Sequence, residues 1–267
     1  MPSHRTGQML VPCERLLRGP PDRPKVLSAP AACATLQSVM GHLRSIARSL
    51  LPSACVLCGA ECTRAQICAP CDAELPRLPA QRCAVCALPL PSGLVCGACL
   101  DRSPLYTRVV AAFAYRYPLD ALIQAYKYGG RLAYARLFGD ALAAVASHDV
   151  DLIIPMPLAP GRLAERGFNQ ALEVARVVSA TTGIPLQPLA CRKVLETPAQ
   201  AALPWKERAR NVRRAFVCDA DLRGKRVAIV DDVLTTRTTL NELSRVIRRA
   251  GAVAIAGWIV ARTLPRW

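Results

Sequence analysis

The sequence predicts an α/β fold, a parallel sheet flanked by helices, preceded by a small cysteine-rich module. From about residue 105, apolar runs of strand length alternate with longer segments of helical periodicity, which is the pattern of a parallel sheet with helical crossovers. Before that point, cysteines recur in pairs that are separated by two residues. The chain has 267 residues, of which 52% are hydrophobic, and this suffices for one sizeable domain and a small one.

The expected strands and helices follow one another along the second part of the chain, residues 105–267. Strands are expected at 109–115, 152–155, 226–230 and 252–260, and helices at 119–126, 131–146, 169–181 and 239–250. Gly251 should end the last helix, since glycine is favoured just after the last helical residue. Ligands bind beyond the carboxyl ends of the strands in such sheets, so candidate sites are expected there.

The first part of the chain carries weaker signals. Residues 1–39 are rich in proline and basic residues without a sustained period, and we expect a disordered tail. Residues 40–51 place Leu43, Ile46 and Leu50 at helical spacing and predict an amphipathic helix. Two alternatives stay open for residues 1–39: an over-extended reading frame with Met40 as the true start, or an arginine-rich organelle-targeting segment. These residues lack the continuous apolar region of a secretory signal peptide.

The charge distribution indicates a polyanionic ligand. The net charge is +16, divided into +5 for residues 1–51, zero for 52–104 and +11 for 105–267. A basic domain attracts phosphorylated small molecules and nucleic acid alike, so charge alone does not choose between them. Apolar runs such as 253–261 are too short to span a bilayer, and we expect no membrane insertion.

The cysteine-rich module, residues 52–104, contains an internal repeat that predicts two structural zinc ions. Each ligand position recurs 28 residues later along the sequence. The eight predicted ligands are Cys55, Cys58, Cys68, Cys71, Cys83, Cys86, Cys96 and Cys99. Paired Cys-x2-Cys knuckles can place four thiolates tetrahedrally around zinc, and this use of cysteine favours a reducing cytosol over disulfides. The alternative is a set of ordinary buried cysteines.

A second candidate site is the stretch IVDDVLTTRTTL, residues 229–240. Asp231 and Asp232 follow a short apolar strand, and Thr235–Thr239 leads directly into a helix. Backbone N–H groups at a helix start, with several hydroxyls, favour an anion. Two carboxylates beside an anion site would repel the anion unless they accept hydrogen bonds from sugar hydroxyls or face a cation. A phosphorylated ribose therefore fits both the carboxylates and the threonine segment. The alternative is a turn followed by an ordinary helix cap.

Basic residues elsewhere could serve the same anion. Arg162 and Arg166 stand four apart in a glycine-flanked segment after Pro155 and Pro157, so both can face one diphosphate. Lys127 precedes a Gly-Gly pair and can reach a phosphate as a point charge. The alternatives are a solvated basic surface for the two arginines and an ordinary exposed lysine.

These segments together resemble a known family. The stretch 229–240 resembles the ribose-phosphate motif of type I phosphoribosyltransferases, in which Thr-Thr-Gly follows Asp-Asp-x2. Four further features resemble the ComF/GntX family within that class. They are the paired cysteines, AYKYGG at 125–130, PMPL at 155–158 with RGFNQ at 166–170, and TPAQ at 197–200 with Arg208 and Asn211. The resemblance covers about residues 50–262.

The resemblance implies a type I phosphoribosyltransferase-like domain that binds phosphoribosyl pyrophosphate, or a related sugar phosphate, with Mg²⁺. Asp231 and Asp232 would be catalytic, holding the ribose and favouring its cationic ring. The residues implied to bind substrate are Lys127, Arg162, Arg166 and Arg208 with Thr235, Thr236, Arg237, Thr238 and Thr239. A pentosyl transfer to an unknown acceptor, a cytoplasmic location and links to DNA uptake and a helicase partner are also implied.

Arg237 departs from the family pattern, because glycine is usual at its position. Glycine serves where φ is positive or where backbone approaches phosphate closely, so we expect Arg237 to weaken or alter binding. It could occlude the cradle, grip the phosphate or swing outward. The competing class of function is a non-catalytic zinc-ribbon interaction protein that binds single-stranded DNA or a helicase, with a vestigial or sensing pocket. Aromatic residues make up only 5% of the chain, which argues mildly against binding by base stacking.

Overall fold

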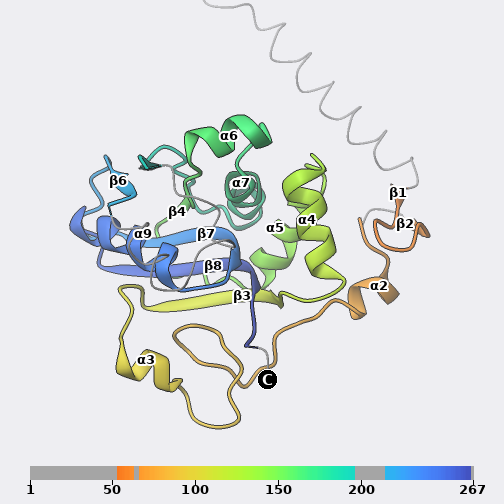
Figure 1. Cartoon of the computed structure of the whole chain (residues 1–267), viewed down its shortest axis with the longest axis horizontal. Helices are drawn as coiled ribbons and strands as arrows, with labels where there is room; N and C mark the ends of the chain where they lie inside the picture. The colour runs from red at the N-terminus through yellow and green to blue at the C-terminus, as the bar shows by residue number, and fades with distance from the viewer. Residues whose placement is uncertain (1–52, 63–65, 196–213, 266–267) are drawn as a thin grey trace, which may run out of the picture. The chain divides into compact units, whose positions relative to one another are not determined.

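The central element of the computed structural model, which describes residues 53–62, 66–195 and 214–265, is a four-stranded parallel sheet. Figure 1 shows the strands in the order β3-β8-β7-β4. They are β3 (Arg108–Ala114), β4 (Leu152–Pro155), β7 (Arg226–Leu234) and β8 (Ala254–Arg262). The predicted fold class is confirmed. The expected tail and amphipathic helix, residues 1–39 and 40–51, lie outside the described residues.

Helices cover both faces of the sheet. Both faces need cover because successive side chains of each strand point to opposite faces and most of them are apolar. The helices are α4 (Leu119–Tyr128), α5 (Tyr134–Val145), α7 (Gln170–Thr182) and α9 (Thr238–Arg249). Along β7, Ala228 and Val230 join the apolar core beneath α4, α5 and α7, whereas Val227 and Ile229 join the core beneath α9. Within the described ranges, no helix is both long enough and apolar enough to cross a bilayer.

Two features were not predicted from the sequence. A short helix α6 (Pro160–Arg166) follows β4 and ends at Gly167, which has the left-handed φ of 76° that glycine adopts readily. A two-stranded antiparallel sheet joins β5 (Cys191–Lys193) to β6 (Phe216–Cys218) and lies beside α9.

Residues of the cysteine-rich module pack in both apolar cores of the domain. Its elements are β1 (Ser53–Ala54), β2 (Glu61–Cys62), α2 (Ala69–Ala73) and α3 (Gly97–Asp101). Cys55 and Leu75 from its first half pack in the core beneath α4 and α5. Leu78 and Ala87, from the connection and the second half, pack in the core beneath α9. The duplicated module therefore contacts the domain on both faces of its sheet.

The connection between the two halves of the module also covers an edge of the sheet. The backbone N–H of Ala114 in β3 donates to the carbonyl of Pro76 at 2.7 Å. Arg77 forms an isolated antiparallel bridge with Phe113, and its guanidinium lies over the Phe113 ring at 4.8 Å. The outer edge of β3 is thus partly paired rather than left open.

Candidate functional site

The eight predicted zinc ligands form two separate clusters. We call the group of Cys55, Cys58, Cys68 and Cys71 the first cysteine cluster, and the group of Cys83, Cys86, Cys96 and Cys99 the second cysteine cluster. In each, the four Sγ atoms lie within 4.8 Å of one another. A tetrahedral zinc with bonds of about 2.3 Å holds its sulfurs about 3.8 Å apart, so both clusters fit structural Zn²⁺.

The two clusters repeat the same local geometry. The N–H of Cys68 donates to Cys55 Sγ at 3.4 Å, and the N–H of Cys96 donates to Cys83 Sγ at the same distance. The Sγ atoms of the second and third ligands lie 3.6 Å apart in both clusters. Each third cysteine precedes a five-residue helix, α2 or α3. This duplication confirms the repeat that the sequence predicted and supports two metal sites of one kind.

The acidic pair lies within β7 rather than after it. β7 pairs with β4 only as far as Val230 but continues along β8 to Leu234. The expected end of this strand at Val230 was therefore wrong, because the long partner β8 extends the ladder. Asp231 and Asp232 still lie beyond the carboxyl end of β4, where the sheet offers an open side to a ligand.

The environment of the two carboxylates differs. Asp232 is buried, and its Oδ2 lies 3.0 Å from Lys127 Nζ, at the end of α4. Burial, followed by repulsion from Asp232, raises the pKa of Asp231 to about 8, although Lys127 and the N–H of Asp232 act in the opposite direction. Asp231 is therefore largely protonated at neutral pH, while its neighbour is held in an ion pair.

Lys127 forms a half-buried ion pair rather than an exposed surface charge. Burial disfavours the charge of Lys127, but the attraction of Asp232 more than offsets this and raises the pKa of Lys127. Gly129 caps the end of α4 two residues after Lys127, and a Cβ at Gly129 would lie 2.7 Å from the carbonyl oxygen of Ala125. The sequence predicted the cation but not its carboxylate partner.

Arg166 lies near this ion pair, at the end of α6. Its guanidinium lies over the ring of Tyr128 at 5.0 Å and donates to the Tyr128 hydroxyl at 3.2 Å. Its buried Nε has no hydrogen-bond partner among the described residues. A cation with an unused donor at this position suits an anionic group of a ligand. Arg162 lies on the same helix, half-buried, with its role still a prediction.

The segment between α6 and α7 is organised by Asn169. Its Oδ1 accepts from the N–H of Ala171 at 3.0 Å and of Leu172 at 3.4 Å, which caps α7. Its Nδ2 donates to the carbonyl of Met156 at 3.1 Å. One side chain thus fixes both the helix start and the loop that follows β4.

The threonine segment forms the start of α9. We call Thr235–Thr239 the phosphate loop. Thr235 is exposed, and the Oγ1 of Thr236 is buried without a hydrogen-bond partner in the described part of the chain. Thr238 and Thr239 begin the helix itself, where backbone N–H groups lack intrahelical acceptors. The loop retains the donors that an anion requires.

Arg237 points away from the phosphate loop toward the second cysteine cluster. Its backbone has φ −71° and ψ −5°, so the strain expected for a side chain at a left-handed glycine position does not arise. Its Nη1 donates to Cys99 Sγ at 3.0 Å, and its Nη2 donates to the carbonyl of Ala98 at 2.9 Å. Of the three outcomes that the sequence left open, the structure shows the outward one.

Arg208, with residues 197–200 and Asn211, falls outside the described residues, so its role also stays a prediction. Arg262 was not predicted. It is 4% exposed at the end of β8 and donates to carbonyls of the phosphate-loop region and of the second cysteine cluster. The only signal in the sequence was an arginine at the end of an otherwise apolar strand.

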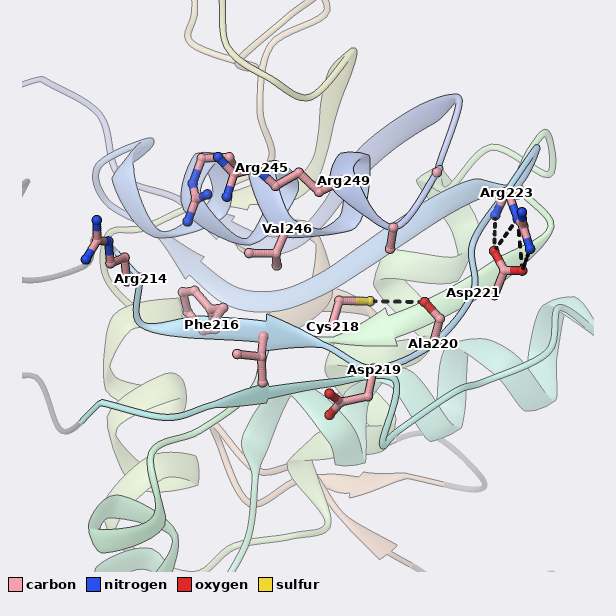
Figure 2. Close-up of a pocket in the computed structure, with 13 residues that line it drawn as sticks. Arg214, Phe216, Cys218, Asp219, Ala220, Asp221, Arg223, Arg245, Val246 and Arg249 are labelled. Atoms are coloured by element: carbon pink, nitrogen blue, oxygen red, sulfur yellow. Dashed lines mark hydrogen bonds and ion pairs between the residues drawn. The ribbon is translucent and has the colours of Figure 1, made fainter.

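A groove lies apart from these residues, between β6 and the end of α9 (Figure 2). Its lining includes Arg214, Arg245, Arg249, Phe216 and Cys218. Arg245 pairs with Glu242 of its own helix at 2.7 Å, and the backbone N–H of Arg214 donates to the same carboxylate at 2.7 Å. The guanidinium groups of Arg214 and Arg249 form no ion pair with a carboxylate among the described residues. None of the predicted site residues in the described ranges lines the groove.

Comparison with known proteins identifies related chains. A family model described as a double zinc ribbon domain matches residues 46–100. The chain is 36% identical over 178 residues to competence protein F of Haemophilus influenzae, covering 62% of this chain and 78% of that protein. It is 32% identical over 191 residues to the DNA utilization protein YhgH of Escherichia coli, covering 68% and 84% respectively. It is 26% identical over 153 residues to competence protein ComFC of Streptococcus pneumoniae, covering 57% and 67%.

Solved structures show a weaker similarity. A glutamine phosphoribosylpyrophosphate amidotransferase from B. subtilis matches with a TM-score of 0.37 and 22% identity, over 51% of this chain and 30% of that one. A purine phosphoribosyltransferase from Pyrococcus horikoshii matches with a TM-score of 0.31 and 21% identity, over 52% and 86%. Because both scores are low, the family assignment depends on the sequence relatives.

Proposed function

The chain belongs to the ComF family, and from that premise we propose that it binds phosphoribosyl pyrophosphate with Mg²⁺ at the carboxyl end of β7 and acts in DNA uptake. The link to DNA comes from the relatives, which are named as competence and DNA utilization proteins. The ligand is inferred from the chemistry of the site. Both parts are open to direct test.

The observation that carries the proposal is the grouping of acidic and basic side chains around the end of one strand. Asp231 and Asp232 can accept hydrogen bonds from the ribose hydroxyls. Lys127 and Arg166, drawn together from α4 and α6, supply positive charge for a diphosphate. The phosphate loop offers N–H groups and hydroxyls to the 5′-phosphate. One phosphorylated ribose uses all three parts.

The reaction supported by this arrangement is displacement at the ribose C1 carbon. The bond between C1 and the pyrophosphate oxygen breaks, its electron pair leaves with pyrophosphate, and a second substrate supplies the electron pair of the new bond. Asp231 and Asp232 stabilise the positive charge that develops on the ring. Lys127 and Arg166 offset the negative charge of the leaving pyrophosphate. We assign no protein nucleophile, so the accepting group belongs to the second substrate.

The acidic pair also fits Mg²⁺ that enters with the substrate. Mg²⁺ favours oxygen ligands and is usually held by one or two carboxylates together with substrate phosphates. Lys127 already engages Asp232, and Asp231 carries a raised pKa, so the pair is a weak metal site without a ligand. When bound, Mg²⁺ would supply charge neutralisation for the diphosphate.

Calorimetry with phosphoribosyl pyrophosphate and Mg²⁺ tests the proposal. The unmodified protein should bind. The Asp231→Ala/Asp232→Ala variant loses the acceptors for the ribose hydroxyls and should bind at least about tenfold more weakly, which corresponds to about 1.4 kcal/mol. Asp140→Asn, an exposed position on α5, is the matched control and should bind as the unmodified protein does. Absence of binding by the unmodified protein would refute the proposed ligand.

The groove of Figure 2 favours a second candidate function, binding of single-stranded DNA. Its arginines lie on α9 and beside β6, and in the described part of the chain the guanidinium groups of Arg214 and Arg249 form no ion pair with a carboxylate. Guanidinium groups bind phosphates well, and such binding is sequence-independent. In this reading the sugar-phosphate site would sense a ligand rather than turn it over, and a helicase partner stays a prediction.

Fluorescence anisotropy with a labelled oligothymidine separates this candidate from the first. Arg214→Glu/Arg249→Glu should weaken binding. If each arginine neutralises one phosphate, the magnitude of the negative slope of log affinity against log salt should fall by about 1.4, since a single strand contributes about 0.7 per phosphate. Arg136→Glu, on the exposed face of α5, makes a charge change at a distant position. Equal weakening by the control would show only a general charge effect.

A further inference from the structure

We propose that the second cysteine cluster, with its zinc, positions the phosphate loop, and that Arg237 and Arg262 are the two connecting residues. This inference deepens the proposed function and rests on it, because the phosphate loop is the part of the site assigned to the 5′-phosphate. It gives the zinc module a role beyond stabilising its own fold. It also gives Arg237 a function in place of the glycine that the family pattern favours.

Arg237 makes the first connection. Its backbone occupies the position directly before α9, and its guanidinium donates to Cys99 Sγ at 3.0 Å and to the carbonyl of Ala98 at 2.9 Å. One acceptor is the fourth ligand of the second cysteine cluster, and the other is the residue beside it. The side chain is thereby held outside the cradle, which leaves the N–H groups at the helix start open to an anion.

Arg262 makes the second connection, from the end of β8. Its Nε donates to the carbonyl of Cys86 at 3.1 Å, on the zinc side. Its Nη1 donates to the carbonyls of Leu234 at 2.6 Å and Thr235 at 3.0 Å, on the loop side. One buried guanidinium therefore ties a ligand residue of the second cysteine cluster to the last residue of β7 and to the first residue of the phosphate loop.

The charges of these groups are complementary. Neither Arg237 nor Arg262 forms an ion pair with a carboxylate among the described residues, and a buried cation without a counter-charge is costly. Zn²⁺ with four thiolates has a formal charge of −2. The two guanidinium groups have a formal charge of +2, so the zinc-loaded second cysteine cluster balances them.

The first cysteine cluster provides an internal comparison. It has the same ligand geometry, but it packs in the core beneath α4 and α5. Within the described ranges, no hydrogen bond joins its cysteines to the phosphate loop. Loss of zinc from the two clusters should therefore have different effects on the loop.

Hydrogen–deuterium exchange on the zinc-loaded full chain tests the proposal. Cys96→Ser and Cys68→Ser replace the equivalent third ligand of the second and first clusters. Cys96→Ser should accelerate exchange in residues 234–240 by about tenfold or more, because loop residues exchange through local opening. Cys68→Ser should leave these residues unchanged. Equal exchange in residues 234–240 of both variants would overturn the proposal.

Arg237→Gln keeps the test informative if Cys96→Ser fails to fold. This variant should retain two zinc ions per chain and still show faster exchange at residues 234–240 than the unmodified protein. Unchanged exchange there would contradict the positioning role of Arg237. Exchange is measured without ligand. Faster exchange at residues 234–240 in the variants, together with no binding of phosphoribosyl pyrophosphate, would therefore support this inference and refute the proposed function.

Ligand affinity supplies the final readout. Emptying the second cysteine cluster should weaken phosphoribosyl pyrophosphate binding by about tenfold or more, since the released Arg237 side chain can enter the cradle and the loop loses its preorganised conformation. Cys96→Ser/Arg237→Gly should recover part of this loss, because it removes the side chain that can occlude. No recovery, with faster loop exchange, would assign the loss to Arg262 alone and overturn the role given to Arg237.

Discussion

Arg237 occupies a position where glycine is usual in phosphate loops of the type I phosphoribosyltransferase kind. Its backbone lies in the right-handed region, so the position itself requires no glycine in this chain. Its side chain is accommodated because the second cysteine cluster offers a sulfur and a carbonyl as acceptors. An arginine is therefore accepted here because of acceptors that lie outside the motif, and the motif sequence alone does not predict them.

At the same scale, Lys127 and Asp232 should be strongly coupled. Lys127→Met leaves the buried Asp232 carboxylate without its cation and should lower the free energy of unfolding by about 1–3 kcal/mol, less than for a fully buried pair. Lys127→Met/Asp232→Asn should recover part of that loss. Urea denaturation at neutral pH measures both. The exposed pair Arg136–Asp140 is the control cycle, and comparable coupling there would contradict the expectation.

The raised pKa of Asp231 predicts a proton-linked binding reaction. Asp231 is largely protonated below its pKa of about 8 in the free protein. Ribose hydroxyls and a nearby cation favour the carboxylate, so binding should lower this pKa and release up to about one proton near neutral pH. Affinity should therefore rise with pH and level off above about 8. Calorimetry in buffers of different ionisation enthalpy measures the release, and Asp231→Asn should abolish it.

At the scale of elements, the length of β7 depends on its neighbour. Polar residues after an apolar run predicted that the strand ends at Val230, and its ladder with β4 does end there. The nine-residue partner β8 continues the ladder to Leu234. The carboxylates are therefore held on a rigid strand rather than on a loop, which fixes their position relative to Lys127.

The start of α7 should depend on a single side chain. Asn169→Ala removes the cap and the contact with Met156, and should lower the free energy of unfolding by about 1 kcal/mol or more. Asn169→Asp keeps the capping oxygen but loses the donor to the Met156 carbonyl. Thermal and urea unfolding should place it between the unmodified protein and the alanine variant. Equal losses for both variants would indicate that the cap contributes little.

At the scale of the whole molecule, one duplicated module supports two different surfaces. The first half of the module packs with the core beneath α4 and α5, and residues of the second half pack with the core beneath α9. The chain thus uses two copies of one metal-binding geometry for two structural purposes. Zinc in the first cysteine cluster should matter mainly for stability, and zinc in the second for the ligand site as well.

Metal analysis of the purified chain should give two zinc ions. Cys58→Ser and Cys86→Ser should each remove one of them, because each replaces a ligand of a separate cluster. Cys218→Ser, which changes a cysteine of β6 outside both clusters, should retain two. Elemental analysis by mass spectrometry decides this. A content well below two, or a loss of both ions in a single variant, would contradict two independent sites.

Much of this organisation could be predicted from spacing and periodicity. Local patterns predict the 28-residue cysteine repeat, the four parallel strands and their helices, and the acidic pair near the carboxyl ends of the strands. The contacts of Arg237 and Arg262 with the second cysteine cluster could not be predicted, because they join residues more than 130 positions apart. The α6 helix and the β5–β6 sheet were missed because short elements give little periodic signal.

The position of β8 in the sheet has a consequence for synthesis of the chain. β8 lies between β3 and β7, and Arg108 of β3 pairs with Ala256 of β8, a partner that the ribosome adds 148 residues later. During that interval β3 lacks the strand that covers its inner edge, while the Pro76–Arg77 connection can already cover its outer edge. We expect the nascent chain to present an apolar, half-protected strand to chaperones until β8 emerges.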